Sequence, residues 1–228
     1  MITPQPIRQP RLLLEDLRDA FRHPALKALT INIQKHRNVY SAGDEADMIY
    51  LVESGQIKTV MLSPGGKECL LTIHTVGDLF GESCLASVRA RPETATAMED
   101  TILKGIRHRM FLTYLASNSL HELALQYLTD RLVERQEVIT DLISVDSEHR
   151  LGKVLLQLGR KLGKKGPFYV RIEHRISHEE LSQIVGTTRP RVSQFIHKFR
   201  TLGLIDVSAE HFLIIKEQQL TEYLMRTA

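Results

Sequence analysis

The sequence predicts an α+β fold in which a jelly-roll β-barrel precedes a long helix and a C-terminal winged helix-turn-helix. Three observations predict this order. Short apolar runs alternate with turns from about residue 31 to 107, a coiled-coil-like stripe covers residues 120–145, and two capped helices meet at a glycine within residues 176–205. We therefore expect three parts: residues 1–117 with the barrel and its flanking helices, 118–146 with the long helix, and 147–228 with the winged domain.

The predicted barrel consists of short strands that end at turn residues. Apolar runs such as IYLV, IKTVML and CLLTIHTV are separated by glycine-containing turns, which is typical of a small β-sandwich or barrel. Because glycine adopts a left-handed backbone without strain, the expected corners are Gly43, Gly55, Gly77 and Gly81. Before the barrel, residues 12–29 follow the helical period, and Pro24 predicts a break between two short helices.

The long helix carries two apolar stripes. One advances in alternating steps of three and four, like a coiled-coil seam with one polar member: Leu125, Leu128, Leu132, Arg135, Ile139 and Leu142. The other is expected to face the barrel: Leu123, Tyr127, Val138 and Ile143. A helix with two apolar faces needs two partners, so we expect a homodimer built on the seam. The alternative is a helix buried within a monomer.

Residues 176–205 carry the start and stop signals of two helices. Ser177 and Glu180 form a predicted capping box, and Gly186 supplies a turn. Thr188 can cap the second helix, with Pro190 in its first turn. The positions expected to face the core are Val192, Phe195, Ile196, Phe199 and Leu202. Arg, Gln, Ser and Lys lie off this stripe, and such side chains suit a DNA major groove. An ordinary amphipathic helix with a solvated face is the alternative.

The segments around these helices complete the predicted domain. Residues 151–162 form another amphipathic helix, 160–166 a basic exposed connection, and 168–176 a strand or strand pair. Residues 204–207 and 212–215 are expected to form a two-stranded wing, and 217–225 a closing helix.

Composition and charge limit the functional classes. Residues 149–228 hold 14 Lys and Arg against 7 Asp and Glu, a net +7, whereas the first 148 residues hold 16 against 20, a net −4. This asymmetry favours a polyanion as the partner of the C-terminal third. No apolar run approaches the roughly 20 residues of a membrane helix, and the N-terminus lacks the apolar core of a signal peptide, so we expect a cytoplasmic protein without a membrane partner. Cys69 and Cys84 are too few for a disulfide framework or an iron–sulfur ligand set, and both are expected in the core.

Three motifs in this order resemble one family. The segments GDEADMIYLVESGQIKT (43–59), GDLFGE (77–82) and ELSQIVGTTRPRVSQFI (180–196) look like its nucleotide-binding fold, the lead into its phosphate-binding cassette, and its turn and recognition helix. The family comprises the bacterial regulators named for the cyclic-AMP receptor protein and the fumarate–nitrate regulator (CRP/FNR), and the resemblance covers nearly the whole chain.

The resemblance implies a homodimer that binds a two-fold symmetric operator in double-stranded DNA and contacts RNA polymerase, usually as an activator. By position, Arg189 matches the family's first base-reading arginine, Pro190 stands where the family has glutamate, and Gln194 replaces a later arginine. The residues expected to bind DNA are Thr187, Thr188, Arg189, Arg191, Ser193, Gln194 and Lys198.

The predicted effector pocket departs from the family pattern. Gly81 and Glu82 match the ribose-binding pair, but Glu93 and Thr94 fall where cyclic-nucleotide binders have an Arg-Ser pair for the phosphate, and a carboxylate there repels an anion. Arg91 is the candidate substitute. On the long helix, Arg135 and Gln136 replace the Thr and Ser that meet the adenine. These residues are expected to form a vestigial or altered pocket: Gly81, Glu82, Arg91, Thr94, Arg135 and Gln136.

We therefore expect a regulator that does not depend on cyclic AMP and holds no cofactor or metal. A regulator that needs a cyclic nucleotide or another small effector is one alternative. A haem sensor, with His74 or Cys84 as an axial ligand, is another. A regulatory module for an enzyme would bind effector but not DNA. The sequence shows no phosphate-cradling glycine loop, metal-spaced ligand set or nucleophile motif, so we do not expect an enzyme.

Overall fold

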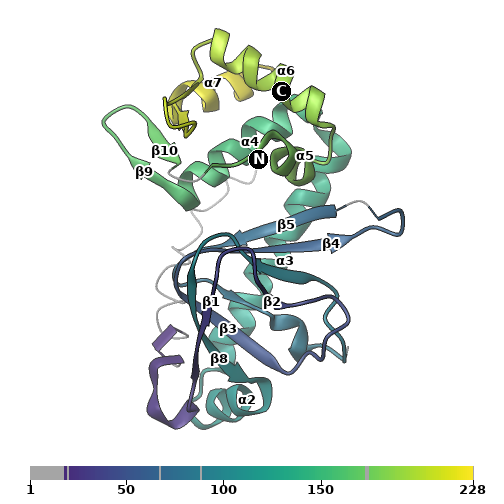
Figure 1. Ribbon diagram of the computed structural model, residues 1–228, viewed down its shortest axis with the longest axis vertical. Helices are drawn as coiled ribbons and strands as arrows, with labels where there is room; N and C mark the ends of the chain where they lie inside the picture. Colours follow the sequence, from purple (N-terminus) through teal and green to yellow (C-terminus); the bar gives the residue numbers. More distant parts are fainter. Residues whose placement is uncertain (1–17, 20, 67, 88, 173–174, 228) are drawn as a thin grey trace, which may run out of the picture. The chain divides into compact units, whose positions relative to one another are not determined.

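A computed structural model of the chain describes residues 18–19, 21–66, 68–87, 89–172 and 175–227 (Figure 1). Contacts divide the chain into two units. The first contains the described part of residues 1–61 together with 72–135, and the second contains 62–71 and 136–228. The helices expected in residues 12–29 lie largely outside the described residues. Within that stretch Arg18, Asp19, Phe21 and Arg22 are helical, and a 3-10 turn, η1, covers Pro24–Leu26.

The β domain is a sandwich of two four-stranded sheets (Figure 1). The first sheet has the order β1, β8, β3, β6, with bounds Leu29–Ile33, Thr101–Arg107, Met48–Ser54 and Leu79–Phe80. The second has the order β2, β7, β4, β5, with bounds Asn38–Tyr40, Thr94–Ala97, Ile57–Leu62 and Glu68–His74. Among the strands that the structure describes, no pairing joins the sheets into a ring. The jelly-roll prediction is therefore confirmed, but the sheets face each other as a sandwich and do not close into a barrel.

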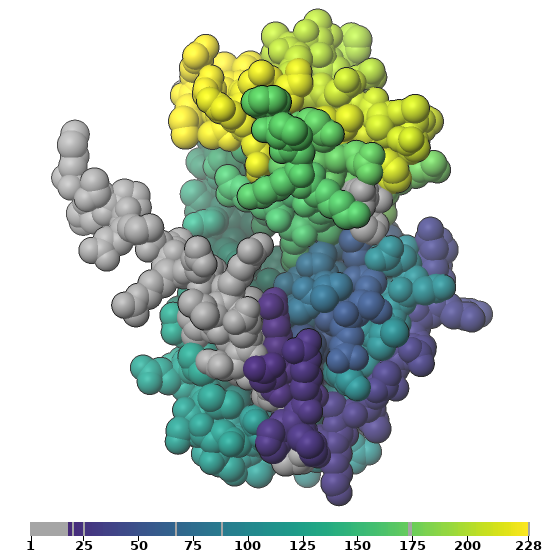
Figure 2. Space-filling view, turned by 90° about the vertical axis from the view of Figure 1, so that its left-hand side faces the viewer, coloured from purple at the N-terminus to yellow at the C-terminus, as the bar shows by residue number. Residues whose placement is uncertain are grey.

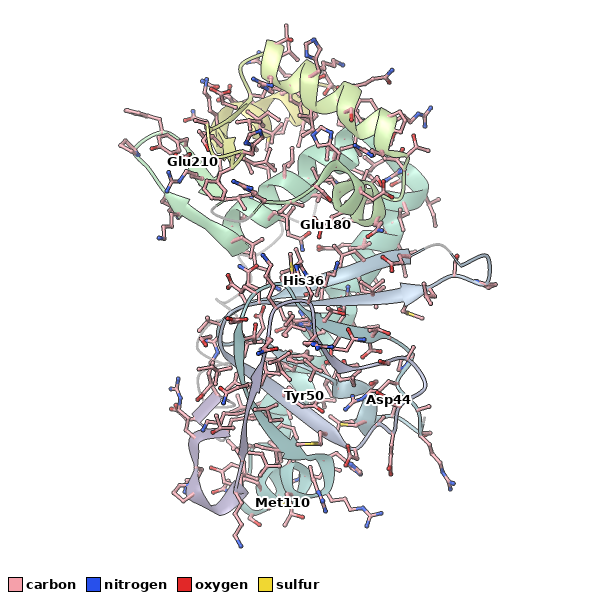
Figure 3. The ribbon with its side chains drawn as sticks, in the orientation of Figure 1. His36, Asp44, Tyr50, Met110, Glu180 and Glu210 are labelled. Atoms are coloured by element: carbon pink, nitrogen blue, oxygen red, sulfur yellow. The ribbon has the colours of Figure 1, made fainter. Side chains whose placement is uncertain are left out.

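The side chains between the two sheets come from both layers. Tyr40, Ile57, Ala95 and Ala97 of the second sheet pack against residues of the first. Tyr50, Val52, Phe80 and Leu103 supply that side of the cluster. Strand residues alternate between the two faces, so each strand contributes every second side chain to this core. Figure 3 shows Tyr50 in the interior of the sandwich.

The four predicted corner glycines all adopt positive φ angles: Gly43 94°, Gly55 84°, Gly77 85° and Gly81 82°. Gly55 joins β3 to β4 and lies close to the backbone of β8. A Cβ atom there would lie 2.4 Å from Thr101 Oγ1 and 2.7 Å from the Asp100 carbonyl oxygen. The Gly55 turn thus requires glycine both for its backbone angle and for its close approach to β8.

Gly55→Ala is expected to destabilise the protein strongly. The positive φ alone costs a non-glycine residue about 1–3 kcal/mol, and the collision with Asp100 and Thr101 adds to that cost. Gly65→Ala is the matched control, because a Cβ atom at Gly65 meets nothing within 4 Å. The measurement is the urea midpoint by circular dichroism. Equal midpoints for the two variants would contradict the turn geometry.

A second apolar cluster lies on the other face of the first sheet. It contains Phe21, Ile49, Leu51, Leu79 and further residues. Helix α2, His108–Ser117, contributes Phe111 and Leu115. The 3-10 turn η2, Glu82–Leu85, adds Cys84, which is 6% exposed, whereas Cys69 is exposed. The core prediction is therefore confirmed for Cys84 and wrong for Cys69, which faces outward on β5.

Helix α3, His121–Ser144, is the predicted long helix. The structure describes every residue of α3, and none of them is buried. The N-terminal half of the second predicted stripe packs as expected, since Tyr127 contacts the α2 cluster. The other half does not, because Val138 and Ile143 are 44% and 83% exposed. The helical period continues there, but among the described residues it leaves both side chains largely exposed.

The second unit consists of helices around a small sheet of order β11, β12, β10, β9. The helices are α4 Ser147–Leu162, α5 His178–Val185, α6 Arg189–Thr201 and α7 Glu217–Thr227. The strands are β9 Gly163–Lys165, β10 Val170–Ile172, β11 Ile205–Val207 and β12 Leu213–Ile215. The wing and closing helix are thus where the sequence predicts them. The segment predicted as a basic exposed connection, 160–166, instead contains the strand β9, which pairs with β10 through Lys164 and Arg171.

No helix among the described residues is both long enough and apolar enough to cross a bilayer.

Candidate nucleic-acid interface and effector pocket

The helix-turn-helix is held by the local bonds that its sequence predicts. Ser177 Oγ accepts from the Glu180 backbone N–H at 3.1 Å, and the Ser177 N–H donates to Glu180 Oε2 at 2.9 Å. Gly186 ends α5 in the left-handed region, with φ 68° and ψ 44°. Arg150 of α4 donates from Nε to the Val185 carbonyl at 3.0 Å, so α4 also supports the turn. Figure 3 shows Glu180 at the start of α5.

Ser177→Ala is expected to lower the free energy of unfolding by about 1 kcal/mol, because it removes the Oγ that accepts from the Glu180 N–H and donates to Glu180 Oε2, while the bond from the Ser177 N–H to Glu180 remains. Thr188→Ala is the matched control. Thr188 occupies the same N-cap position of α6 but makes no side-chain cap hydrogen bond, so its replacement should cost less. Urea unfolding of the two variants measures the difference. A larger loss for Thr188→Ala would contradict this assignment of the caps.

Helix α6 has a buried face and an exposed face. Val192, Ile196 and Phe199 are at most 4% exposed and hold the helix against the domain. Two of the predicted core positions differ, because Phe195 is only partly buried and Leu202 is 50% exposed. Thr188, Arg189, Arg191 and Gln194 are exposed. Figure 2 shows α6, in yellow-green, at the surface. This arrangement presents two guanidinium groups and one amide to a partner.

Three other predicted DNA-binding residues have different surroundings. Thr187 is 8% exposed, and its backbone N–H donates to the Ser182 carbonyl at 3.1 Å. Ser193 Oγ lies 2.8 Å from His178 Nδ1, which joins α6 to α5. Neither hydroxyl stands on the exposed face with Arg189 and Gln194.

Lys198 belongs to a polar cluster that joins three helices. Its Nζ donates to Glu148 Oε1 and Oε2 of α4 at 2.7 and 2.8 Å. Tyr223 of α7 donates to Glu148 Oε1 at 2.6 Å. The bond to Glu148 raises the pKa of Lys198 to about 12. Lys198 therefore fixes α6 to its scaffold, and a DNA phosphate would have to compete with Glu148 for it.

The predicted effector pocket is occupied by its own side chains. Arg91 is 2% exposed, and its Nη1 donates to the Gly81 carbonyl at 2.7 Å and to Ser83 Oγ at 3.2 Å. Its Nη2 donates to the Met48 carbonyl. The guanidinium carbon lies 4.3 Å from the centre of the Tyr40 ring. The candidate substitute for the family's phosphate-binding arginine thus bonds to backbone carbonyls.

The pair that replaces Arg-Ser also bonds internally. Glu93 Oε1 accepts from the Tyr40 hydroxyl at 2.8 Å, and Thr94 Oγ1 accepts from the Ala42 N–H at 3.0 Å. Burial and the Glu93 carboxylate raise the pKa of Tyr40, so the phenol stays a neutral donor. Tyr40, Tyr50 and Phe80 form a stack with centroid distances of 5.1 to 6.2 Å. This stack fills the space beside Arg91.

Helix α3 contributes Tyr127, which the sequence predicts to face the barrel, and Arg131, which the sequence did not single out. Tyr127 donates from its hydroxyl to the Leu79 carbonyl at 3.2 Å, just before the cassette. Arg131 lies one turn before Arg135 and interacts electrostatically with Glu82. Within the part of the chain that the structure describes, Arg131 Nε and Nη2 are buried without a hydrogen-bond partner. The spacing of four residues from Tyr127 and from Arg135 was the available signal.

Of the two α3 positions predicted from the adenine-binding pattern, only Arg135 is close to this cluster. Burial lowers the pKa of Arg135, and the charge of Arg131 lowers it further. Gln136 is exposed. Glu82 and Glu134 act on both arginines, and Asp78 also acts on Arg131, so the two cations of α3 lie among carboxylates.

The haem hypothesis depends on His74 and Cys84. His74 is 2% exposed, with Nε2 3.4 Å from Thr59 Oγ1, and its ring lies 5.2 Å from that of Phe80. Burial raises the pKa of the Cys84 thiol to about 11, which disfavours the thiolate that binds metals. Both side chains pack as core residues, so this geometry gives the haem hypothesis no support.

The predicted seam of α3 is exposed. Its apolar members have these exposed fractions: Leu125 67%, Leu128 36%, Leu132 58%, Ile139 56% and Leu142 47%. Five large apolar side chains along one stripe form a continuous face that burial against a second helix would cover.

Comparisons with known proteins agree with this architecture. A family model described as "Cyclic nucleotide-binding domain" matches residues 30–118, and one described as "Crp-like helix-turn-helix domain" matches residues 149–223. The CRP-like cAMP-activated global transcriptional regulator of Mycobacterium tuberculosis is 29% identical over 86% of this chain and 90% of that protein. The Cyclic AMP receptor protein of Thermus thermophilus is 30% identical over 73% of this chain and 74% of its own length. Among solved structures, a CooA mutant from Carboxydothermus hydrogenoformans is 26% identical, with a TM-score of 0.72 over 89% of this chain and 90% of that one.

Proposed function

This chain belongs to the CRP/FNR family of transcription regulators, and we propose that two copies pair along α3 and bind a two-fold symmetric operator without cyclic AMP. The chain is thus a regulator with a helix-turn-helix, and the proposal concerns its assembly, its operator and its independence of nucleotide. Family membership also supports a contact with RNA polymerase and the activation of transcription.

The exposed face of α6 carries the proposal for DNA. Arg189 stands at the first position of the helix and Gln194 lies about one and a half turns further on, both exposed. An arginine can bridge guanine O6 and N7, and a glutamine can pair with adenine N6 and N7. Arg191 and Thr188 supply donors for the flanking phosphates. We propose that Thr187, Ser193 and Lys198 support α6 from the protein side, given their contacts with Ser182, His178 and Glu148.

The exposed seam of α3 supports the dimer. Leu125 and Leu132 are large apolar side chains, yet both are more than half exposed in the single chain. They lie on a helix of 24 residues that has no buried residue. Burying apolar surface contributes about 25 cal/mol for each Å². A second α3 packed along the same stripe is the simplest partner, because a two-fold interface uses the same face of both copies.

The contacts of Arg91 and Glu93 support independence of cyclic AMP. A cyclic phosphate at this place would meet the Glu93 and Glu82 carboxylates and an Arg91 whose Nη atoms already bond to Gly81, Ser83 and Met48. Charge-assisted bonds to a phosphate require free N–H groups. Two of the three Arg91 nitrogens are thus engaged by the protein, and a nucleotide phosphate would compete with Gly81, Ser83 and Met48 for them.

One observation favours a second candidate function, a response to a different anionic effector. The buried Nε and Nη2 of Arg131 lack an acceptor among the described residues, and Arg135 adds a second cation beside it. Buried arginine donors are normally satisfied. A small carboxylate or phosphate would supply the acceptor, as would a group from the second copy of α3. Calorimetric titration of the purified dimer with such anions separates the two.

Selection from a pool of random duplexes by the ligand-free protein tests the proposed function. We expect enrichment of a symmetric site whose half-sites are about 10 base pairs apart, with a guanine at a fixed place in each half-site. Enrichment only in the presence of cyclic AMP would disprove independence of the nucleotide. No enrichment with or without nucleotide would disprove the operator-binding role.

A further inference from the structure

We propose that Arg91 acts as a built-in substitute for an effector. Its guanidinium holds the cassette, defined here as residues 79–85, in the position that supports α3 when no ligand is bound. This inference deepens the proposed function and rests on it. It assigns a positioning role to Arg91, which acts on DNA binding through the cassette and α3.

The contacts of Arg91 join segments that are distant in the sequence. Its Nη1 reaches the Gly81 carbonyl and Ser83 Oγ, both in the cassette, and its Nη2 reaches the Met48 carbonyl at the start of β3. Arginine suits this role because its planar fork presents several donors in fixed directions, whereas lysine offers one rotatable ammonium group. One side chain therefore links the cassette to the sandwich through two of its nitrogens.

The surroundings of Arg91 compensate for the burial of its charge. The guanidinium carbon lies 4.3 Å from the Tyr40 ring centre and 5.8 Å from that of Tyr50. Tyr40 is itself held by Glu93, which accepts from its hydroxyl at 2.8 Å. A cation over an aromatic face is stabilised when water is excluded. The Glu93 carboxylate, which would repel a cyclic phosphate, thus fixes the Tyr40 ring that stacks on the Arg91 guanidinium.

Space at Gly81 shows how closely Arg91 and the cassette fit. Gly81 has φ 82°, and a Cβ atom there would lie 3.0 Å from Arg91 Nη1, 3.1 Å from the Met48 carbonyl oxygen and 3.1 Å from Tyr50. A side chain at this position would be strained by the positive φ and would require Arg91, Met48 or Tyr50 to shift by a few tenths of an ångström. The glycine that the family pattern assigns to a ribose contact here makes room for a guanidinium.

The cassette is also connected to α3. Tyr127 donates to the Leu79 carbonyl at 3.2 Å, and Arg131 interacts with Glu82. Both α3 residues lie near the seam residues Leu128 and Leu132 on the same helix. Holding the cassette therefore restrains the segment of α3 that carries the proposed dimer seam. Within this unit, the route from Arg91 to α3 runs through the cassette to the hydrogen bond between Tyr127 and the Leu79 carbonyl.

Two other roles for Arg91 lead to different results. As a core residue alone, Arg91 would stabilise the sandwich without effect on DNA binding by the folded protein. As a phosphate-binding residue, Arg91 would break its bonds to the Gly81 and Met48 carbonyls when cyclic AMP binds. The wild-type protein would then respond to the nucleotide.

The test compares Arg91→Met, Arg91→Lys and wild type as full-length proteins, with Lys104→Met as the control for loss of a cation elsewhere in the sandwich. The first measurement is ligand-free affinity for the operator obtained by selection. The second is hydrogen exchange of the cassette amides, which include the Cys84 N–H bonded to the Gly81 carbonyl, and of the next residue, Ala86, whose N–H is bonded to the Ser83 carbonyl.

We expect Arg91→Met to lower operator affinity at least tenfold and to speed cassette exchange at least tenfold, with exchange in α5 and α6 unchanged. Arg91→Lys should retain part of the wild-type operator affinity and part of the slow cassette exchange. Lys104→Met should leave both quantities at their wild-type values. If Arg91→Met unfolds the sandwich, Arg91→Lys decides, because it keeps the charge but cannot bridge the same acceptors.

Wild-type affinity and exchange in folded Arg91→Lys and Arg91→Met would overturn the inference and leave the proposed function intact. A cyclic-AMP titration that saturates wild type and fails with Arg91→Met would overturn it in favour of the phosphate-ligand role. If the wild-type protein selects no operator, the proposed function itself fails.

Discussion

Leu132→Glu is expected to convert the proposed dimer into a monomer and to abolish operator binding at concentrations that saturate the wild type. Leu132 stands in the middle of the seam and is 58% exposed in the single chain. In the dimer, the two-fold axis places the substitution in the interface twice, so two carboxylates would enter an apolar stripe whose one cation, Arg135, already lies near Glu82 and Glu134. Burying an unpaired charge costs several kcal/mol, and about 1.4 kcal/mol corresponds to a tenfold change. Dimerisation should therefore weaken by at least about 100-fold.

The fold of the single chain should not suffer from this change, because the Leu132 side chain is 58% exposed. Gln126→Glu is the matched control, since Gln126 is exposed on the same helix and lies off the seam. Sedimentation velocity measures the assembly, and fluorescence anisotropy with a labelled operator measures binding. If Leu132→Glu stays dimeric, either α3 pairs through another face or the dimer interface does not include α3.

Arg189→Ala is expected to remove discrimination at one base pair of each half-site. A bidentate arginine–guanine contact is worth about 1–3 kcal/mol. Losses at separated positions add roughly, so a symmetric operator should lose about twice this amount in total. Arg189 is exposed at the first position of α6, so its removal leaves the core contacts of Val192 and Phe199 unchanged.

The informative measurement is a comparison of operators with and without the guanine. Wild type should prefer the guanine-containing operator, and Arg189→Ala should bind the two alike. The non-specific affinity and its salt slope should change only slightly, since one phosphate-independent contact is lost. If Arg189→Ala keeps the full preference, another residue reads that position and the placement of the recognition helix is wrong.

The sequence was most informative where local rules decide the structure. The bonds between Ser177 and Glu180, the left-handed Gly186 and the four corner glycines depend on residues a few positions apart, so spacing alone predicts them. The apolar face of α6 was predicted for the same reason at Val192, Ile196 and Phe199.

The sequence was less informative where distant residues decide. Lys198 pairs with Glu148, fifty positions away, and no periodicity in α6 distinguishes that lysine from one that faces a phosphate. Leu202 follows the apolar period but lies at the end of α6, where the helix leaves the core, and it is half exposed.

Arg91 shows the same limit in the effector pocket. Alignment placed it two residues from the expected phosphate position, but its partners Gly81 and Met48 come from other strands and turns. Whether a cation near a pocket is free or already bonded depends on those tertiary contacts. The predicted vestigial pocket therefore remains a proposal, now with named bonds that can be broken one at a time.

Affinity of the wild-type dimer for its selected operator, measured with and without saturating cyclic AMP, tests the central claim most directly. Linkage requires that a nucleotide which favours the DNA-competent state also binds the DNA complex more tightly. The bonded Arg91 and the carboxylate of Glu93 predict equal dissociation constants in the two conditions, within about twofold. A dissociation constant at least tenfold lower with cyclic AMP, about 1.4 kcal/mol or more of coupling, would show that the pocket still receives the nucleotide and would contradict this account.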